Sequence, residues 1–291
     1  MKNLNLKAFI VLLICSIVVS CTEKEDESAA TESDDSPPVI TLKTADFSFL
    51  DAPDTLMAGI TTFKVENRGM FPHNAELVFL GEDHSYDKYL DYLKSNNGQS
   101  PEWATRLGGP SAPISGESSE ATLELVPGSY AIVCGVPVPA AEPHFMKGMM
   151  HPLTVTGQQE SKAPEANITM KMDDYSFGLD SVIEAGTHTI KVENVADQPH
   201  EFLLAKLESG KTVNDMLNWL GEVINSESGP LPQAPGIFLN GVSPMSKGGV
   251  NYIDVDFSPG EYALICPFPD KEDGMPHFMH GMVQQFSVEA E

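Results

Sequence analysis

The chain has 291 residues, of which 41% are hydrophobic and 20% charged, so it is long enough for about two domains with apolar cores. It carries 42 acidic against 17 basic side chains, a formal net charge of −25. Because phosphate contacts need a basic surface, this charge excludes nucleic acid as an expected partner. Such acidity could steer the chain toward cationic partners, although a merely solvated surface explains it at least as well.

Residues 1–20 have the pattern of an export signal. Lys2 and Lys7 precede the apolar run AFIVLLICSIVV. This run is short for a membrane span and has the length of a signal-peptide core. The next residues, VVSC ending at Cys21, resemble the cleavage box of bacterial lipoproteins, in which the cysteine becomes the acylated first residue. That resemblance implies an extracytoplasmic protein anchored by a lipid on Cys21. The residue after Cys21 is Thr and not Asp, which resembles the sorting signal for the outer membrane in many Gram-negative bacteria. An ordinary secretory signal with an incidental cysteine is the alternative.

Residues 21–38 are expected to form a flexible tether. After Cys21 they read TEKEDESAATESDDSPP, which is acidic, rich in Ser and Thr, and without apolar periodicity. No later apolar run is long enough to span a bilayer, so the lipid is expected to be the sole membrane attachment.

The rest of the chain is an internal repeat, with copies at residues 39–157 and 166–291 joined by a polar linker at residues 158–165. We call the copies the first repeat and the second repeat. The matching segments are DFSF and DYSF, AGITTFKVENRGMFPH and AGTHTIKVENVADQPH, VPGSYAIVC and SPGEYALIC, and PHFMKGM and PHFMHGM.

Each repeat is predicted to be mainly β-strand. TTFKVEN and HTIKVEN alternate apolar and polar residues, AELVFL and EFLLAKL are apolar runs of strand length, and SYAIVC and EYALIC follow a Pro-Gly turn. One helix is expected in each repeat, at YDKYLDYLK and at TVNDMLNWLGEVI, where Thr212 is the expected N-cap. Trp219 and the tyrosines of the first helix are interpreted as packing residues. Short strands with turns between them predict an all-β protein of two β-sandwiches, each with a short inserted helix.

Both repeats contain the same ordered set of metal-binding side chains: a His after an early strand, a Cys ending a late strand, then a His and a Met. One thiolate, two imidazoles and a thioether are the ligands of a blue-copper centre, where a weak axial Met helps set the potential. The first repeat supplies His73, Cys134, His144 and Met149, and the second supplies His200, Cys266, His277 and Met282.

On these residues both repeats resemble cupredoxin domains, the family of plastocyanin and azurin. The resemblance implies two tandem Greek-key β-sandwiches, one or two copper ions held by these eight residues, and electron transfer as the function. The spacing departs from the family, because nine residues separate Cys134 from His144 and ten separate Cys266 from His277, where familiar blue-copper loops have only a few.

Other roles for these residues stay open. A disulfide between Cys134 and Cys266 is one alternative, and a metal-free scaffold that binds partners is another. Surplus methionines and histidines near the ligands would suit a Cu(I) carrier or sequestering protein, although flexible Met also fills gaps. Met279 and its neighbour Phe278 are expected to pack, and His280 is expected to be peripheral. The surplus residues are Met146, Met150, His151, Met275, Met279 and His280.

An enzymatic role is not expected. Multicopper oxidases and copper nitrite reductases place a His beside the blue-copper Cys, whereas Cys134 lies between Val133 and Gly135. Cys266 lies between Ile265 and Pro267. No nucleophile elbow, P-loop, dinucleotide fingerprint or zinc-protease helix is present.

Overall fold

The computed structural model describes residues 36–226 and 230–290. The expected signal peptide, the lipid site Cys21 and the tether up to residue 35 lie outside this part of the chain. Among the described residues, no helix combines the length and the apolar character needed to cross a membrane.

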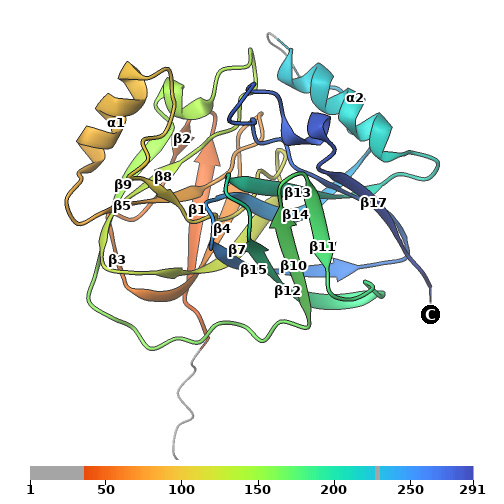
Figure 1. Cartoon of the computed structure of the whole chain (residues 1–291), viewed down its shortest axis with the longest axis horizontal. Helices are drawn as coiled ribbons and strands as arrows, with labels where there is room; N and C mark the ends of the chain where they lie inside the picture. The colour runs from red at the N-terminus through yellow and green to blue at the C-terminus, as the bar shows by residue number, and fades with distance from the viewer. Residues whose placement is uncertain (1–35, 227–229, 291) are drawn as a thin grey trace, which may run out of the picture. The chain divides into compact units, whose positions relative to one another are not determined.

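The described residues are mainly β-strand, as the sequence predicted (Figure 1). In the first repeat the elements are β1 (Val39–Ala45), β2 (Ser48–Phe49), β3 (Thr55–Met57), β4 (Gly59–Asn67), β5 (Glu76–Gly81), α1 (Tyr86–Ser95), β6 (Thr105–Arg106), β7 (Ser118–Leu125), β8 (Gly128–Val133), the 3₁₀ helix η1 (His144–Lys147) and β9 (Met150–Thr156). In the second they are β10 (Ile168–Asp173), β11 (Ser176–Leu179), β12 (Gly186–Asn194), β13 (His200–Leu207), α2 (Val213–Ile224), β14 (Gly236–Met245), β15 (Val250–Phe257), β16 (Gly260–Ile265), the 3₁₀ helix η2 (His277–His280) and β17 (Val283–Val288).

Strand pairing follows the same order in both repeats. β1 pairs antiparallel with β2 and parallel with β4, and β10 pairs in the same way with β11 and β12. β4 is antiparallel to β7, and β12 to β15. β8 lies between β5 and β9, just as β16 lies between β13 and β17. Along β4, buried and half-buried residues alternate strictly, which is the period-two pattern read from TTFKVEN.

One sheet contains strands of both repeats. It has eight strands in the order β11-β10-β12-β15-β7-β4-β1-β2, and the two repeats meet where Tyr252 of β15 pairs with Thr122 of β7. The five-stranded sheet β3-β9-β8-β5-β6 belongs to the first repeat, and the four-stranded sheet β14-β13-β16-β17 belongs to the second. Apolar residues of β1, β4 and β7 pack against those of β5, β8 and β9 as one core, and a second core fills the corresponding space in the second repeat.

The Pro-Gly-x-Tyr segments close a turn in each repeat. The Tyr130 hydroxyl donates to the Val126 carbonyl (2.7 Å) and accepts from the Val126 N–H (3.0 Å). Tyr262 makes the same two bonds to Ser258. A buried tyrosine whose hydroxyl bonds back to the chain a few residues upstream has the geometry of the tyrosine corner known from β-sandwich proteins. Its role here is to fix the start of the strand that leads to each cysteine.

Both predicted helices are confirmed. Thr212 caps α2 through a reciprocal pair of bonds with Asp215, and the apolar stripe of α2 covers the outer face of the four-stranded sheet. Trp219 is 7% exposed and Tyr89 of α1 is 1% exposed, so both pack as expected, whereas Tyr92 of α1 is 38% exposed. Figure 1 shows α1 and α2 flanking the end of the molecule at which the cysteine-bearing strands finish.

Candidate metal centres

Neighbouring strands bring the first His and the Cys of each repeat together. Cys134 and Cys266 directly follow β8 and β16, and both are fully buried. His200 is the first residue of β13, which pairs with β16, and His73 lies three residues before β5, which pairs with β8. Each imidazole therefore reaches the end of the strand that delivers the thiol.

The long loops between Cys and the second His close on themselves. In the first repeat, the His144 N–H donates to the Val136 carbonyl (3.0 Å) and the Phe145 N–H to the Cys134 carbonyl (2.9 Å). In the second repeat, His277 bonds to Phe268 and Phe278 bonds to Cys266 in the same way, at 2.9 Å each. The extra residues thus form a loop whose two ends are hydrogen-bonded to each other, so the longer spacing does not separate the ligands.

The methionines are held in the same turn. The Cys134 N–H donates to the Met149 carbonyl (3.1 Å), and the Met149 N–H donates to the His144 carbonyl (3.0 Å). Met282 makes the corresponding bonds to Cys266 and His277. Gly148 and Gly281, with φ of 97° and 101°, provide the left-handed residue that turns each 3₁₀ helix back toward its Met. Met149 and Met282 are fully buried.

Three donor atoms converge in each repeat. In the first, the Nδ1 atoms of His73 and His144 are 3.0 Å apart and lie 3.9 and 3.4 Å from the Cys134 Sγ. In the second, the Nδ1 atoms of His200 and His277 are 2.9 Å apart and lie 4.0 and 3.4 Å from the Cys266 Sγ. A triangle with these sides has a point about 2.0 Å from all three corners, which is the length of a bond from a metal to an imidazole nitrogen.

Oxygen acceptors assign the proton of each imidazole to Nε2. His73 Nε2 lies 3.3 Å from Asp46 Oδ1, and His144 Nε2 contacts the Val138 carbonyl. Since neither oxygen can donate, each Nε2 carries the hydrogen and each Nδ1 presents a lone pair.

The second repeat has the same arrangement with other acceptors. His200 Nε2 lies 3.1 Å from Asp174 Oδ1, and His277 Nε2 lies 3.2 Å from Gln198 Oε1. In both repeats two nitrogen lone pairs therefore face each other at hydrogen-bond distance with no proton between them. A cation between them removes this repulsion, so the donor set fits a metal ion.

Burial keeps the imidazoles neutral and the thiols protonated in the absence of metal. It lowers the pKa of His144 and of His277 to about 4. It raises the pKa of Cys134 to about 12, and the pKa of Cys266 even further above its usual range. The nearby backbone N–H groups of Asn74 and Val136 at Cys134, and of Glu201 and Phe268 at Cys266, lower the thiol pKa and so oppose the effect of burial.

Two pairs of supporting residues were not identified from the sequence. Asp46 and Asp174 orient the first His of each repeat, and they are the Asp of the DFSF and DYSF segments. Asn67 and Asn194 end the KVEN segments and are buried. Asn67 bonds to Gly69 and Phe71 in the loop before His73, and Asn194 bonds likewise before His200. Their repetition in both copies was the signal that could have marked them.

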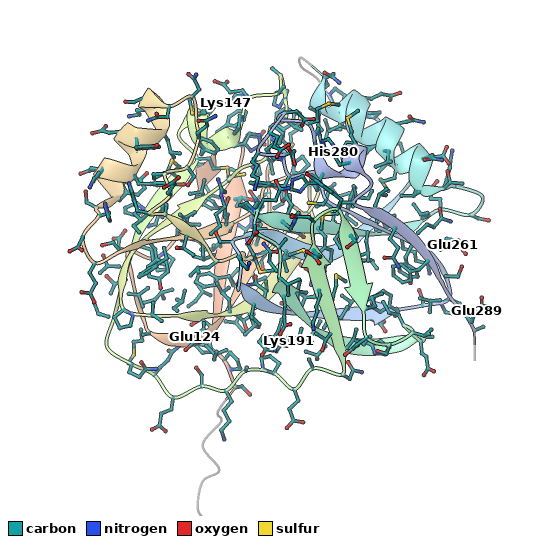
Figure 2. All side chains as sticks on the ribbon, in the orientation of Figure 1. Glu124, Lys147, Lys191, Glu261, His280 and Glu289 are labelled. Atoms are coloured by element: carbon teal, nitrogen blue, oxygen red, sulfur yellow. The ribbon has the colours of Figure 1, made fainter. Side chains whose placement is uncertain are left out.

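The remaining sulfur and histidine side chains lie around the centres and not in them. Cys134 and Cys266 are both free, so the disulfide alternative is not realised. His280 is peripheral, as expected, and its Nε2 lies 3.2 Å from Asp273 Oδ2. Met279 is 58% exposed, so the prediction that it packs is wrong, whereas Phe278 is half-buried. Lys147 and His280, one on each 3₁₀ helix, both lie in the upper part of the view in Figure 2, at the end of the molecule flanked by α1 and α2.

No protein-family model and no curated protein sequence matches the chain. Similar solved structures include a dithionite-reduced auracyanin from the photosynthetic bacterium Roseiflexus castenholzii, with 18% identity over 42% of this chain and 98% of that one and a TM-score of 0.28. Auracyanin A from Chloroflexus aurantiacus, described as a blue copper protein, has 19% identity over 40% and 99% and a TM-score of 0.28. A copper-containing nitrite reductase from Thermus scotoductus has 10% identity over 88% and 62% and a TM-score of 0.26. With TM-scores this low, the functional assignment rests on the geometry of the centres themselves.

Proposed function

We propose that this chain is a copper protein that holds one copper ion in each of two cupredoxin-like repeats and passes single electrons. The observation that carries the proposal is the convergence of two Nδ1 lone pairs and one cysteine sulfur on a common point, which occurs in both repeats. His73, Cys134 and His144 would hold one ion, and His200, Cys266 and His277 the other.

The donor set favours copper over zinc. Structural zinc sites take four Cys or His ligands, and the described residues offer three at each centre. The thioether of Met149 or Met282 would be the additional soft donor, because each Met is fully buried and its backbone bonds to the Cys and the second His of its centre. Two imidazoles, one thiolate and a weak Met ligand are the combination used by electron-transfer copper centres, and bound copper would supply one-electron redox chemistry.

The surroundings of the ligands suit electron transfer. Every ligand side chain is buried, and each imidazole is fixed on its Nε2 side by an oxygen acceptor. Ligands that are held in this way keep the same geometry in both oxidation states of the metal, which lowers the reorganisation energy of electron transfer. The acidic surface supports a redox partner with a basic face.

We further propose that the protein is exported and lipid-anchored at Cys21, and that it is not an enzyme. The signal-like residues 1–20 and the VVSC segment support the anchor. The absence of a His beside Cys134 or Cys266 supports a carrier of electrons without a second catalytic copper site. Membrane fractionation with mass spectrometry of the mature N-terminus tests the anchor, since a soluble protein without a lipid would contradict it.

A second candidate function is Cu(I) handling. Three methionines on the ligand-bearing segments are exposed, namely Met146 at 39%, Met275 at 40% and Met279 at 58%. Exposed thioethers at the mouth of a site suit the transfer of Cu(I) between proteins. Titration with a Cu(I) competitor separates the two functions, because a carrier would bind Cu(I) tightly without a stable blue Cu(II) form.

Metal analysis tests the proposed function. The mature chain is offered copper and zinc together, and the bound metal is counted after removal of the excess. We expect about two copper ions per chain, one in each of the Cys134→Ser and Cys266→Ser variants and none in the double variant. Retention of copper by the double variant, or a preference for zinc, would contradict the proposal.

A further inference from the structure

A seam of backbone bonds joins the two repeats close to both candidate centres. Residues 106–110, which begin at the last residue of β6, lie antiparallel to residues 242–246, which begin in β14 and end one residue after it. The Gly108 N–H donates to the Pro244 carbonyl (3.1 Å), and the Ser243 N–H donates to the Gly109 carbonyl (2.8 Å). Two side chains of this seam, Arg106 and Ser243, reach the surroundings of a cysteine in the opposite repeat.

We propose that each repeat supplies a positioning side chain to the metal centre of the other: Arg106 of the first repeat acts on the Cys266 centre, and Ser243 of the second acts on the Cys134 centre. This inference rests on the proposed function, because it takes both centres to be metal sites. Neither residue contacts the ligand atoms directly, so each acts through one intermediate residue.

Arg106 is fixed by its own repeat and packs on the other. Its guanidinium forms an ion pair with Glu76 of β5, whose side chain is 1% exposed. A buried carboxylate needs such a partner, so Glu76 holds the guanidinium in one place. The guanidinium carbon then lies 5.4 Å from the centre of the Phe268 ring in the second repeat.

Phe268 is the residue that arranges the Cys266 centre. Its carbonyl accepts from the His277 N–H (2.9 Å), and its ring packs against the His277 imidazole with the centroids 5.9 Å apart. The imidazole that it holds lies 3.4 Å, through Nδ1, from the Cys266 sulfur. A displacement of Phe268 would therefore move His277 and expose the Cys266 sulfur that His277 covers.

Ser243 acts in the reverse direction. Its hydroxyl is fully buried, donates to the Pro110 carbonyl (2.6 Å) and accepts from Asn74 Nδ2 (3.0 Å). Asn74 Oδ1 accepts from the N–H of Gly135, the residue after Cys134 (2.9 Å). The Asn74 side chain thus holds the backbone next to Cys134, and Ser243 determines the orientation of the Asn74 amide.

Cysteine alkylation in the metal-free full-length chain tests these contacts without copper. Iodoacetamide modification of Cys134 and Cys266 is followed separately by peptide mass spectrometry, since the rate reports local opening around each thiol. We expect Ser243→Ala to accelerate Cys134 about tenfold and to leave Cys266 unchanged, because a buried amide loses its acceptor. Arg106→Lys keeps a cation for Glu76 but loses the planar stacking on Phe268. It should therefore increase the rate of Cys266 alkylation about threefold and leave the rate of Cys134 alkylation unchanged.

Matched controls and a copper measurement complete the test. Arg68→Gln and Ser181→Ala replace exposed residues of the same types and should change neither rate. In the Cys134→Ser background loaded with copper, Arg106→Lys should shift the thiolate-to-copper absorption band of the remaining centre, whereas Arg68→Gln should not. Unchanged rates, or equal acceleration of both cysteines as in global unfolding, would overturn the inference. If Ser243→Ala affects only Cys134 and Arg106→Lys only Cys266 in a chain that takes up no copper, the contacts between the repeats are supported and the proposed function is overturned instead.

Discussion

The Nδ1 atoms of His200 and His277 face each other at 2.9 Å, while both Nε2 atoms point at oxygen acceptors. The same relationship holds between His73 and His144 at 3.0 Å. Two buried lone pairs at this distance repel each other unless a cation or a proton lies between them. Since burial also opposes protonation of these imidazoles, a metal ion is the group that best accounts for the arrangement.

The carboxylates behind the first His of each repeat should control copper affinity. Asp46→Ala removes the acceptor of His73 Nε2, and we expect the first centre to lose about 10- to 100-fold in affinity while the second is unchanged. Asp174→Ala should have the converse effect, through His200. Competition titrations in single-centre backgrounds measure both. Asp197→Ala, at an exposed position, is the control, and equal losses in all three variants would contradict the assignment.

The buried methionine should tune the potential without being required for binding. In Met282→Leu a weak electron-pair donor is replaced by an apolar side chain of similar volume. Because the more highly charged Cu(II) loses more from this than Cu(I) does, the potential should rise. The thiolate-to-copper band should persist, because Cys266 remains. Spectroelectrochemistry of the Cys134→Ser background gives both quantities. An unchanged potential would show that Met282 is a packing residue only.

Acid should destabilise the metal-free protein between pH 6.5 and 4. Burial lowers the pKa of His144 and of His277 to about 4, so over this range the unfolded chain binds more protons than the folded one. The free energy of unfolding should therefore increase from pH 4 to 6.5 and level off above it. Each group contributes roughly 3 kcal/mol at neutral pH by the conversion of about 1.4 kcal/mol per pKa unit.

Urea unfolding at several pH values, in the presence of a chelator, measures this profile. His277→Gln should reduce the slope of the profile by about half, whereas His84→Gln, which changes a histidine outside the centres, should leave it as it is. Copper loading should shift the acid limb to lower pH, because protons then compete with the metal for the same nitrogens. A profile that is flat from pH 4 to 7 would contradict the neutral, buried state of the imidazoles.

The tyrosine corners should contribute to stability without changing the ligands. Tyr130→Phe removes a hydroxyl that both donates to and accepts from Val126, and we expect a loss of about 1–3 kcal/mol in the free energy of unfolding. Tyr92→Phe in α1, at an exposed position, should cost much less. Denaturant unfolding compares the two variants, and equal small effects would argue against a structural role for the corner.

Local patterns in the sequence predicted the strands, the helices and the ligand types. The alternation of apolar and polar residues in TTFKVEN corresponds to the alternating burial along β4. Thr212 caps α2 because its hydroxyl and the Asp215 carboxylate accept from free N–H groups at the start of the helix. The two copies of the repeat identified His, Cys and Met at equivalent positions. These features depend on neighbouring residues or on self-comparison, and both can be read from one sequence.

The closure of the ligand loops could not be predicted in this way. It depends on backbone bonds such as the one from Phe145 to Cys134, which form only when strand and 3₁₀ helix are both in place. The seam residues Arg106 and Ser243 escaped notice for another reason, because they act across the two repeats and have no partner within their own segment of sequence. Met279 was misjudged since a shared residue can be exposed in both copies.

The absorption spectrum of the copper-loaded chain tests the central claim most directly. We predict an intense thiolate-to-copper band that disappears on reduction and returns on oxidation, is reduced to about half in Cys134→Ser or Cys266→Ser, and is absent from the double variant. A colourless copper-loaded protein, or a band that survives the loss of both cysteines, would contradict the assignment of these residues as electron-transfer copper centres.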